Sequence, residues 1–137
     1  MAADPVRVEN ARAWVQKART DLARVERILS AQPPDLEDAL FHCQQAAEKA
    51  LKGFLTWHDE PFRKTHDLDT LAKQCSQIDP TLSPLLDQAD RLTQYAWLYR
   101  YPADLPEPTE REAAKAFALA GQLVHAILLR LPEQART

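Results

Sequence analysis

Four polar residues recur at helical spacing in the segment 38–58, and their side chains could bind a charged ligand. They are His42, Gln45, Lys49 and Lys52. Intervals of three and four residues place them on one face of an α-helix. Two lysines a turn apart offer a positive patch for a phosphate, and Gln45 could hydrogen-bond a base or a sugar. The alternative is a solvated helix face on which Glu48 balances the lysines, and the commonness of charged helix surfaces favours that interpretation.

A second candidate is His66, which directly precedes an expected helix start at Asp67. The first turn of a helix exposes backbone amides that attract an anion, and Lys64 could assist there. The simpler interpretation, favoured from the sequence, is a histidine that caps the helix or fixes the loop.

A third candidate is an aromatic and basic cluster that precedes a proline-rich turn. Its members are Tyr95, Tyr99, Arg100 and Tyr101. The tyrosines could stack on a base while Arg100 binds a phosphate. The cluster could also form a dimer interface, in which Tyr and Arg are favoured. In the third interpretation the cluster only packs the turn, and Arg100 caps the last carbonyls of its helix.

Other chemistries lack the residues they require. The chain contains no glycine-rich phosphate loop, no Glu-x-x-His pair and no paired Cys/His spacing, so we expect no cofactor, no metal and no catalytic residue of those kinds. A formal net charge of −3 does not favour wrapping of a nucleic acid. Cys43 and Cys75 fall on apolar helix faces, as free thiols in a cytoplasmic protein do. No apolar run approaches the roughly 20 residues that cross a bilayer.

The elements that must position these residues are helices. The 137 residues include 2 glycines, with 45% hydrophobic and 27% charged residues, which favours an all-α fold. Periodicity predicts helices over 10–30 and 38–58, a third that Thr65 or His66 caps, and two more over 83–99 and 109–131. We expect Asn10, Asp35 and a Thr109-x-x-Glu112 capping box at helix starts.

These helices predict an all-α, antiparallel up-and-down bundle of four to five helices. The apolar stripe of the second helix includes Leu40, Cys43, Ala47 and Phe54, so we expect this helix to be the hydrophobic centre. The length suits a single domain over 1–137, with a core from about residue 10 to 131 and flexible ends, including a frayed tail from Pro132.

Four short motifs, in order along the chain, resemble the HEPN domain family. They are ARAW with DL at 11–14 and 21–22, FHCQQAAEKALK at 41–52, THDL at 65–68, and YRYP at 99–102. The resemblance implies an all-α bundle that is often a homodimer. It also implies one of three functions: metal-independent RNase, commonly a toxin; partner of a minimal nucleotidyltransferase; or nucleotide-binding module.

The chain departs from the pattern of the RNase members, in which an Arg is followed after four to six residues by a His. Arg100 stands where that Arg would be, but Leu105, Pro106 and Glu107 occupy the positions of the His. None of these three replaces an imidazole, whose pKa near neutrality suits proton transfer at a phosphate.

The sequence therefore predicts a non-catalytic nucleotide- or partner-binding module, homodimeric and cytoplasmic, paired with a minimal nucleotidyltransferase in a toxin–antitoxin-like system. The candidate ligand is a nucleotide or RNA, and no membrane is involved. One alternative is a metal-independent RNase with a variant site that joins Arg100 and Tyr101 to His66 or His42. Another is a structural, oligomerising bundle.

Overall fold

Residues 4–99 and 105–137 are described in the computed structural model of the chain, and every regular element within them is helical. The elements are α1 (Pro5–Ser30), α2 (Leu36–Trp57), α3 (Leu68–Ile78), the 3₁₀ turn η1 (Pro80–Leu82), α4 (Ser83–Ala89), the 3₁₀ segment η2 (Asp90–Ala96), α5 (Glu110–Leu128) and α6 (Glu133–Arg136). The predicted all-α helical bundle is confirmed. No described helix is both long and apolar enough to cross a membrane.

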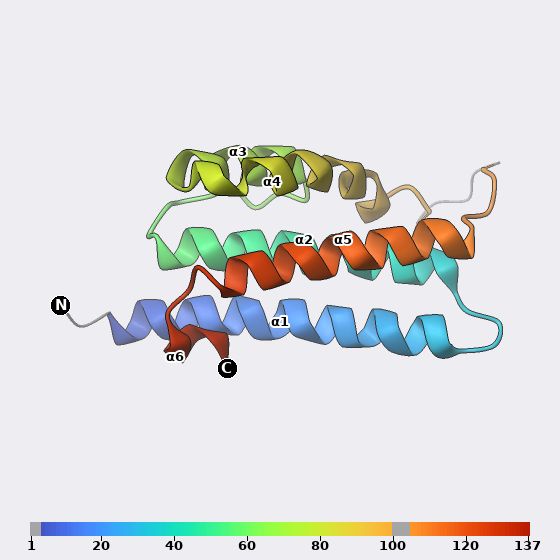
Figure 1. Cartoon of the computed structure of the whole chain (residues 1–137), viewed down its shortest axis with the longest axis horizontal. Helices are drawn as coiled ribbons and strands as arrows, with labels where there is room; N and C mark the ends of the chain where they lie inside the picture. Colours follow the sequence, from blue (N-terminus) through green and yellow to red (C-terminus); the bar gives the residue numbers. More distant parts are fainter. Residues whose placement is uncertain (1–3, 100–104) are drawn as a thin grey trace.

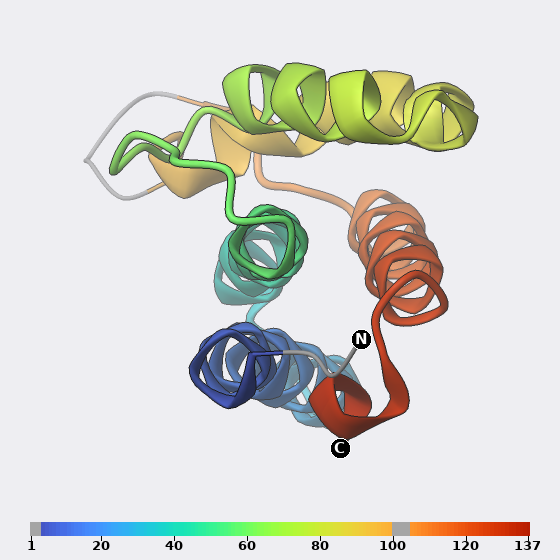
Figure 2. The same ribbon diagram turned by 90° about the vertical axis from the view of Figure 1, so that its left-hand side faces the viewer.

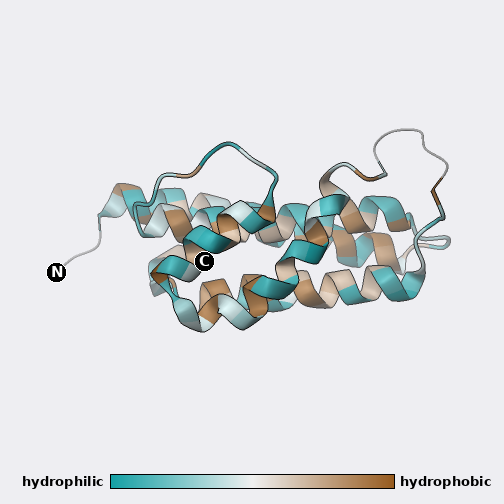
Figure 3. Ribbon diagram, turned by 90° about the horizontal axis from the view of Figure 1, so that it is seen from above, coloured by the Kyte–Doolittle hydropathy of each residue, from teal (hydrophilic) through white to brown (hydrophobic). Residues whose placement is uncertain are grey.

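Helix α2 lies at the centre of the bundle, where it contacts α1, α3, α5 and η2 (Figure 1). Helix α1 lies along one side of α2, while α3, α4 and η2 form a layer on the other side (Figure 2). Seen from above, hydrophobic and hydrophilic residues alternate along the helices, as amphipathic helices require (Figure 3). Leu40, Cys43, Leu51 and Phe54 are all at most 1% exposed, which confirms the predicted apolar stripe.

Helices α1 and α2 approach each other closely at Gly53. A Cβ atom at this position would lie 3.2 Å from Trp14 Cβ and 3.5 Å from Val15 Cγ2. The missing side chain therefore lets the two backbones pack closely, which brings polar groups on α1 within reach of α2.

Local capping signals account for some helix boundaries and fail at others. Asp35 caps α2 through Asp38 N, and Thr109 caps α5 through Glu112 N, both as predicted. The start of α1 was predicted at Asn10 but lies at Pro5, because Asp4 accepts a hydrogen bond from Val6 N and proline is well suited to a first turn. The prediction that Thr65 or His66 caps α3 is wrong.

The N-cap of α3 is Asp67, whose side chain accepts from Asp69 N at 3.0 Å. Thr65 Oγ1 instead accepts from Asp67 N, one step earlier in the loop. This leaves the ring of His66 available for a different partner, described below.

The predicted helix over 83–99 is divided into α4 and η2. The buried residues Ala89, Leu92 and Tyr95 recur every three residues. A 3₁₀ segment has three residues per turn, so this spacing keeps Leu92 and Tyr95 on the face that is buried.

The C-terminal segment was predicted to fray from Pro132, but it forms α6 and packs on α1. Ala135 is buried, and Arg136 Nε donates to Leu131 O at 2.9 Å. Arg12 Nε on α1 donates to Thr137 O at 2.7 Å, which ties the last residue to the first helix.

Both cysteines are fully buried, and burial raises the pKa of each thiol to about 12. Because the thiolate is the reactive form, we expect neither Cys43 nor Cys75 to be alkylated by iodoacetamide at pH 8 in the folded protein. Mass spectrometry after unfolding in guanidinium should show both modified. Rapid labelling of either cysteine under native conditions would contradict its burial in the core.

Candidate functional site

The first polar cluster joins α1 to α2 through a buried carboxylate. Asp21 falls within the apolar stripe of α1, between Ala18 and Val25, and is 6% exposed. Its position in that stripe turns it toward α2. Asp21 is not among the site residues predicted from the sequence, although a carboxylate at an apolar stripe position is a signal that could have identified it.

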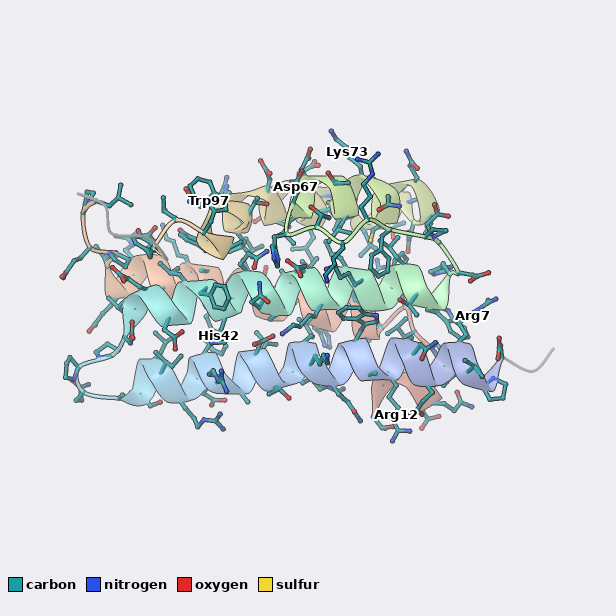
Figure 4. The ribbon with its side chains drawn as sticks, turned by 180° about the vertical axis from the view of Figure 1, so that it is seen from behind. Arg7, Arg12, His42, Asp67, Lys73 and Trp97 are labelled. Atoms are coloured by element: carbon teal, nitrogen blue, oxygen red, sulfur yellow. The ribbon has the colours of Figure 1, made fainter. Side chains whose placement is uncertain are left out.

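Asp21 binds two of the predicted site residues at once. Its Oδ1 lies 2.9 Å from His42 Nδ1, and its Oδ2 accepts from Lys49 Nζ at 2.6 Å. A carboxylate paired with a lysine accepts hydrogen bonds only, so Nδ1 of His42 carries the proton. Figure 4 shows His42 on the side of α2 that faces α1.

The other nitrogen of His42 lies between a cation and an anion. Nε2 is 3.5 Å from Arg24 Nη1 and 3.4 Å from Asp38 Oδ1. Neutral His42 can accept from Arg24, whereas protonated His42 can donate to Asp38. The ring can therefore remain hydrogen-bonded in either charge state.

These residues border a surface hollow of about 380 Å³, which we term the α1–α2 groove. It is lined by Lys17, Thr20, Asp21, Arg24, Phe41, His42, Gln45 and Lys49. Three of these side chains are cationic and one is a carboxylate, so the groove has a net positive charge in a protein whose overall charge is −3. In the described structure, Lys17 and Arg24 form no salt bridge: Lys17 Nζ lies 5.8 Å from the ring centroid of Trp14, and Arg24 contacts only the uncharged acceptor of His42. Neither cation is therefore neutralised by a carboxylate of the described residues, and both can pair with an anion.

A second polar cluster, which we term the Glu48 cluster, joins α2 to the loop before α3. Its members are Gln44, Glu48, Lys52 and His66. Glu48 Oε2 accepts from Lys52 Nζ at 3.0 Å, and Glu48 Oε1 lies 2.7 Å from His66 Nδ1. The side chains of Glu48 and Lys52 are 4% and 7% exposed.

Lys52 does not contribute to an open positive patch. Its ammonium group lies 5.5 Å from the ring centroid of Trp14 and 5.9 Å from that of Phe62, within the range of cation–π attraction. The interpretation of residues 42, 45, 49 and 52 as a solvated face is wrong, because His42 is 8% and Lys52 is 6% exposed. Both are buried because α1 and the loop cover the edges of α2.

The path of the loop follows from the way α2 ends. His58 is the C-cap, and Asp59 adopts a left-handed conformation with φ of 55°. Asp59 N donates to Thr56 O and Glu60 N to Leu55 O, the pair of bonds of a Schellman motif. The motif reverses the chain, and the loop then brings His66 beside Glu48.

A hydrogen bond between two glutamines links the α1–α2 groove to the Glu48 cluster. Gln45 Nε2 donates to Gln44 Oε1 at 2.6 Å, and Gln44 Nε2 donates to Glu48 Oε1 and to His66 O, both at 3.1 Å. Gln45 lines the α1–α2 groove, whereas Gln44 is fully buried. The structure thus divides the predicted site residues between two neighbouring sites: His42, Gln45 and Lys49 in one, Lys52 and His66 in the other.

The predicted tyrosine pair lies apart from both clusters. The rings of Tyr95 and Tyr99 are stacked, with centroids 6.4 Å apart, and Tyr95 OH donates to Glu112 Oε1 at 2.7 Å. Burial and this hydrogen bond raise the pKa of Tyr95. The pair borders a hollow of about 290 Å³ with three carboxylates, Asp35, Glu37 and Asp38. These acidic neighbours disfavour a phosphate, and Arg100 and Tyr101 lie outside the described residues.

In the described ranges, no group of three or more His, Cys, Asp or Glu side chains is arranged to hold a metal ion. The ionisable residues of both clusters are instead paired with one another. The arrangement suits binding of an anion in the α1–α2 groove.

Comparison with known proteins identifies two similarities. The family model described as the HEPN domain matches residues 11–131. The crystal structure of TT1696 from Thermus thermophilus is similar, with a TM-score of 0.77 and 28% sequence identity over 88% of this chain and 98% of that one. No curated protein matches the chain.

Proposed function

Because this chain belongs to the HEPN domain family, we propose that it is a non-catalytic HEPN module that binds a nucleotide through its phosphates in the α1–α2 groove. The groove provides the cations for the phosphates, and Gln45 provides an amide for the sugar or the base. No residue of the groove is assigned a catalytic role.

The observation that supports this proposal is the pairing of Lys49 with Asp21. A lysine held at 2.6 Å by a carboxylate that is itself fixed by His42 has little conformational freedom left to lose when it binds a ligand. Arg24 adds a planar donor suited to phosphate oxygens at the same rim.

We also propose a homodimer and a partner protein, a minimal nucleotidyltransferase, in a toxin–antitoxin-like system. This part of the proposal rests on the family resemblance. The absence of a histidine at positions 105–107 supports a binding role over RNase activity, because the family's Arg-x4-6-His motif is incomplete.

Isothermal titration with ATP and GTP at low ionic strength tests nucleotide binding. We expect Lys49→Ala and Lys17→Ala each to raise Kd about tenfold or more, since a hydrogen bond to a charged group contributes roughly 1.5–3 kcal/mol. Circular dichroism should first show that both variants are folded. Added salt should weaken binding, because it screens exposed charges.

Lys73→Ala is the matched control. Lys73 is an exposed lysine on α3 that pairs with Asp69, outside the groove. Its Kd should equal that of the wild type. Absence of heat with both nucleotides, or an equal loss in all three variants, would contradict the proposal. Cleavage of a mixed RNA pool by the purified protein in a chelator would contradict its non-catalytic part.

A further inference from the structure

His66 is a solvent-exposed histidine held from its inner side by buried groups. Its side chain is 70% exposed, yet Nδ1 lies 2.7 Å from Glu48 Oε1, whose side chain is 4% exposed. Its backbone oxygen accepts from Gln44, which is fully buried. A loop side chain on a protein surface normally keeps its rotamer freedom. The ring of His66 is instead held by a hydrogen bond at Nδ1, while its Nε2 edge faces outward.

The Glu48 cluster determines which nitrogen of His66 is protonated. Glu48 is ion-paired with Lys52 at 3.0 Å, so it is a carboxylate and can only accept hydrogen bonds. Nδ1 of His66 must therefore be the donor. The neutral ring then carries its lone pair on Nε2, on the exposed edge, where no described residue binds it. A histidine arranged in this way is a nucleophile oriented by a carboxylate.

The loop that carries His66 also carries two cationic residues that can attract an anion. Arg63 and Lys64 lie on the same loop, both are exposed, and neither forms a salt bridge in the described parts of the chain. The adjacent carboxylate, Asp67, is committed to the start of α3, where it accepts from Asp69 N at 3.0 Å and Thr70 Oγ1 at 2.8 Å. Figure 4 shows Asp67 at the start of α3, above α2.

We propose that His66 is a phosphoryl-acceptor site, at which Nε2 takes a phosphoryl group from an acyl phosphate. The lone pair of Nε2 attacks phosphorus and a P–N bond forms. The bond from phosphorus to the acyl oxygen breaks, and its electron pair leaves on the carboxylate product. The proton on Nδ1 stays on the ring, where the Glu48 carboxylate stabilises the positive charge that develops.

This site is independent of the nucleotide proposal, because it uses the loop before α3 and no residue of the α1–α2 groove. It also gives the buried Glu48–Lys52 pair a role beyond packing. Lys52 Nζ holds the Glu48 carboxylate at 3.0 Å, and this carboxylate accepts the hydrogen bond of His66 Nδ1, which fixes the orientation of the ring.

The test is to incubate the full-length protein with acetyl phosphate and map the sites by mass spectrometry without acid treatment. Phosphorylation adds PO₃H to a peptide and is distinguished by mass from acetylation of lysines. The bond of a phosphohistidine hydrolyses in acid and survives in base, which identifies it further. The wild type contains its own controls, since His58 and His125 are also exposed. We expect His66 to be modified at least about tenfold faster than either of them.

Three variants complete the test. His66→Asn should abolish the modification, and His125→Ala should leave it unchanged. Glu48→Gln, once shown by circular dichroism to be folded, should slow it by at least about tenfold, since a carboxylate that fixes the tautomer of a catalytic imidazole is worth one to several orders of magnitude in rate. Equal rates at the three exposed histidines, no modification at His66, or an unchanged rate in folded Glu48→Gln would each overturn the proposal.

Discussion

Replacing Glu48 with alanine is expected to lower the free energy of unfolding by about 3–5 kcal/mol, the usual loss when one member of a buried ion pair is removed. Lys52 would keep its charge in a site where its side chain is 7% exposed. The rings of Trp14 and Phe62 would still attract its ammonium group, but cation–π contacts contribute only about 0.5–2 kcal/mol. The two hydrogen bonds that Glu48 Oε1 makes with Gln44 and His66 would also be lost.

Urea denaturation followed by circular dichroism measures this loss. The informative control is the double variant Glu48→Met/Lys52→Met. Removal of both charges leaves no buried ion, so the stability of the double variant should lie much nearer to that of the wild type than the stability of Glu48→Ala does. A Glu48→Ala protein within about 1 kcal/mol of the wild type would show that Lys52 reaches solvent, and the burial of the Glu48 cluster would then be wrong.

Asp21→Ala is expected to lower the free energy of unfolding by about 2–3 kcal/mol. This loss is smaller than that of Glu48→Ala because the cation that loses its partner, Lys49, can reach solvent. Two donors, His42 Nδ1 and Lys49 Nζ, would lose their acceptor. A buried donor without a partner costs about 1–3 kcal/mol, and His42 is in that position. The side chain of Lys49 is 22% exposed, so its ammonium group can turn to water and its charge need not remain unpaired in the interior.

Asp21→Asn removes the charge of this side chain but keeps its shape, so it tests the two contributions separately. The amide oxygen can still accept one hydrogen bond, so this variant should lose about half as much stability as Asp21→Ala. Thermal and urea unfolding at pH 7 provide the comparison. If Asp21→Ala were as damaging as Glu48→Ala, the ammonium group of Lys49 would have to be trapped in the interior, and the open rim of the α1–α2 groove would be contradicted.

Helix α2 carries two separate polar sites in addition to its apolar stripe. Successive residues on this helix face different partners: Gln45 and Lys49 lie at the groove beside α1, whereas Gln44 and Glu48 lie under the loop that carries His66. A helix surrounded on several sides can present two chemistries a few residues apart, because successive residues are turned by about 100° around its axis.

The sequence by itself determined the helical class, most helix positions and two of the caps. These depend on interactions within a few residues: the 3.6-residue period of apolar side chains, proline in the links, and the Asp35 and Thr109 side chains that bind nearby amides. It also identified α2 as the centre, since its stripe is the most continuous. Such signals are local, so one sequence is sufficient to detect them.

Only the tertiary structure decided which polar residues meet. Asp21 is 21 residues from His42 and 28 from Lys49. Glu48 meets His66 only because a Schellman motif reverses the chain after α2. The period of one helix gives the direction of a side chain but not the helix or loop that covers it. The same spacing of 42, 45, 49 and 52 is therefore compatible with a solvated face, and the packing of α1 and the path of the loop divide it into two sites.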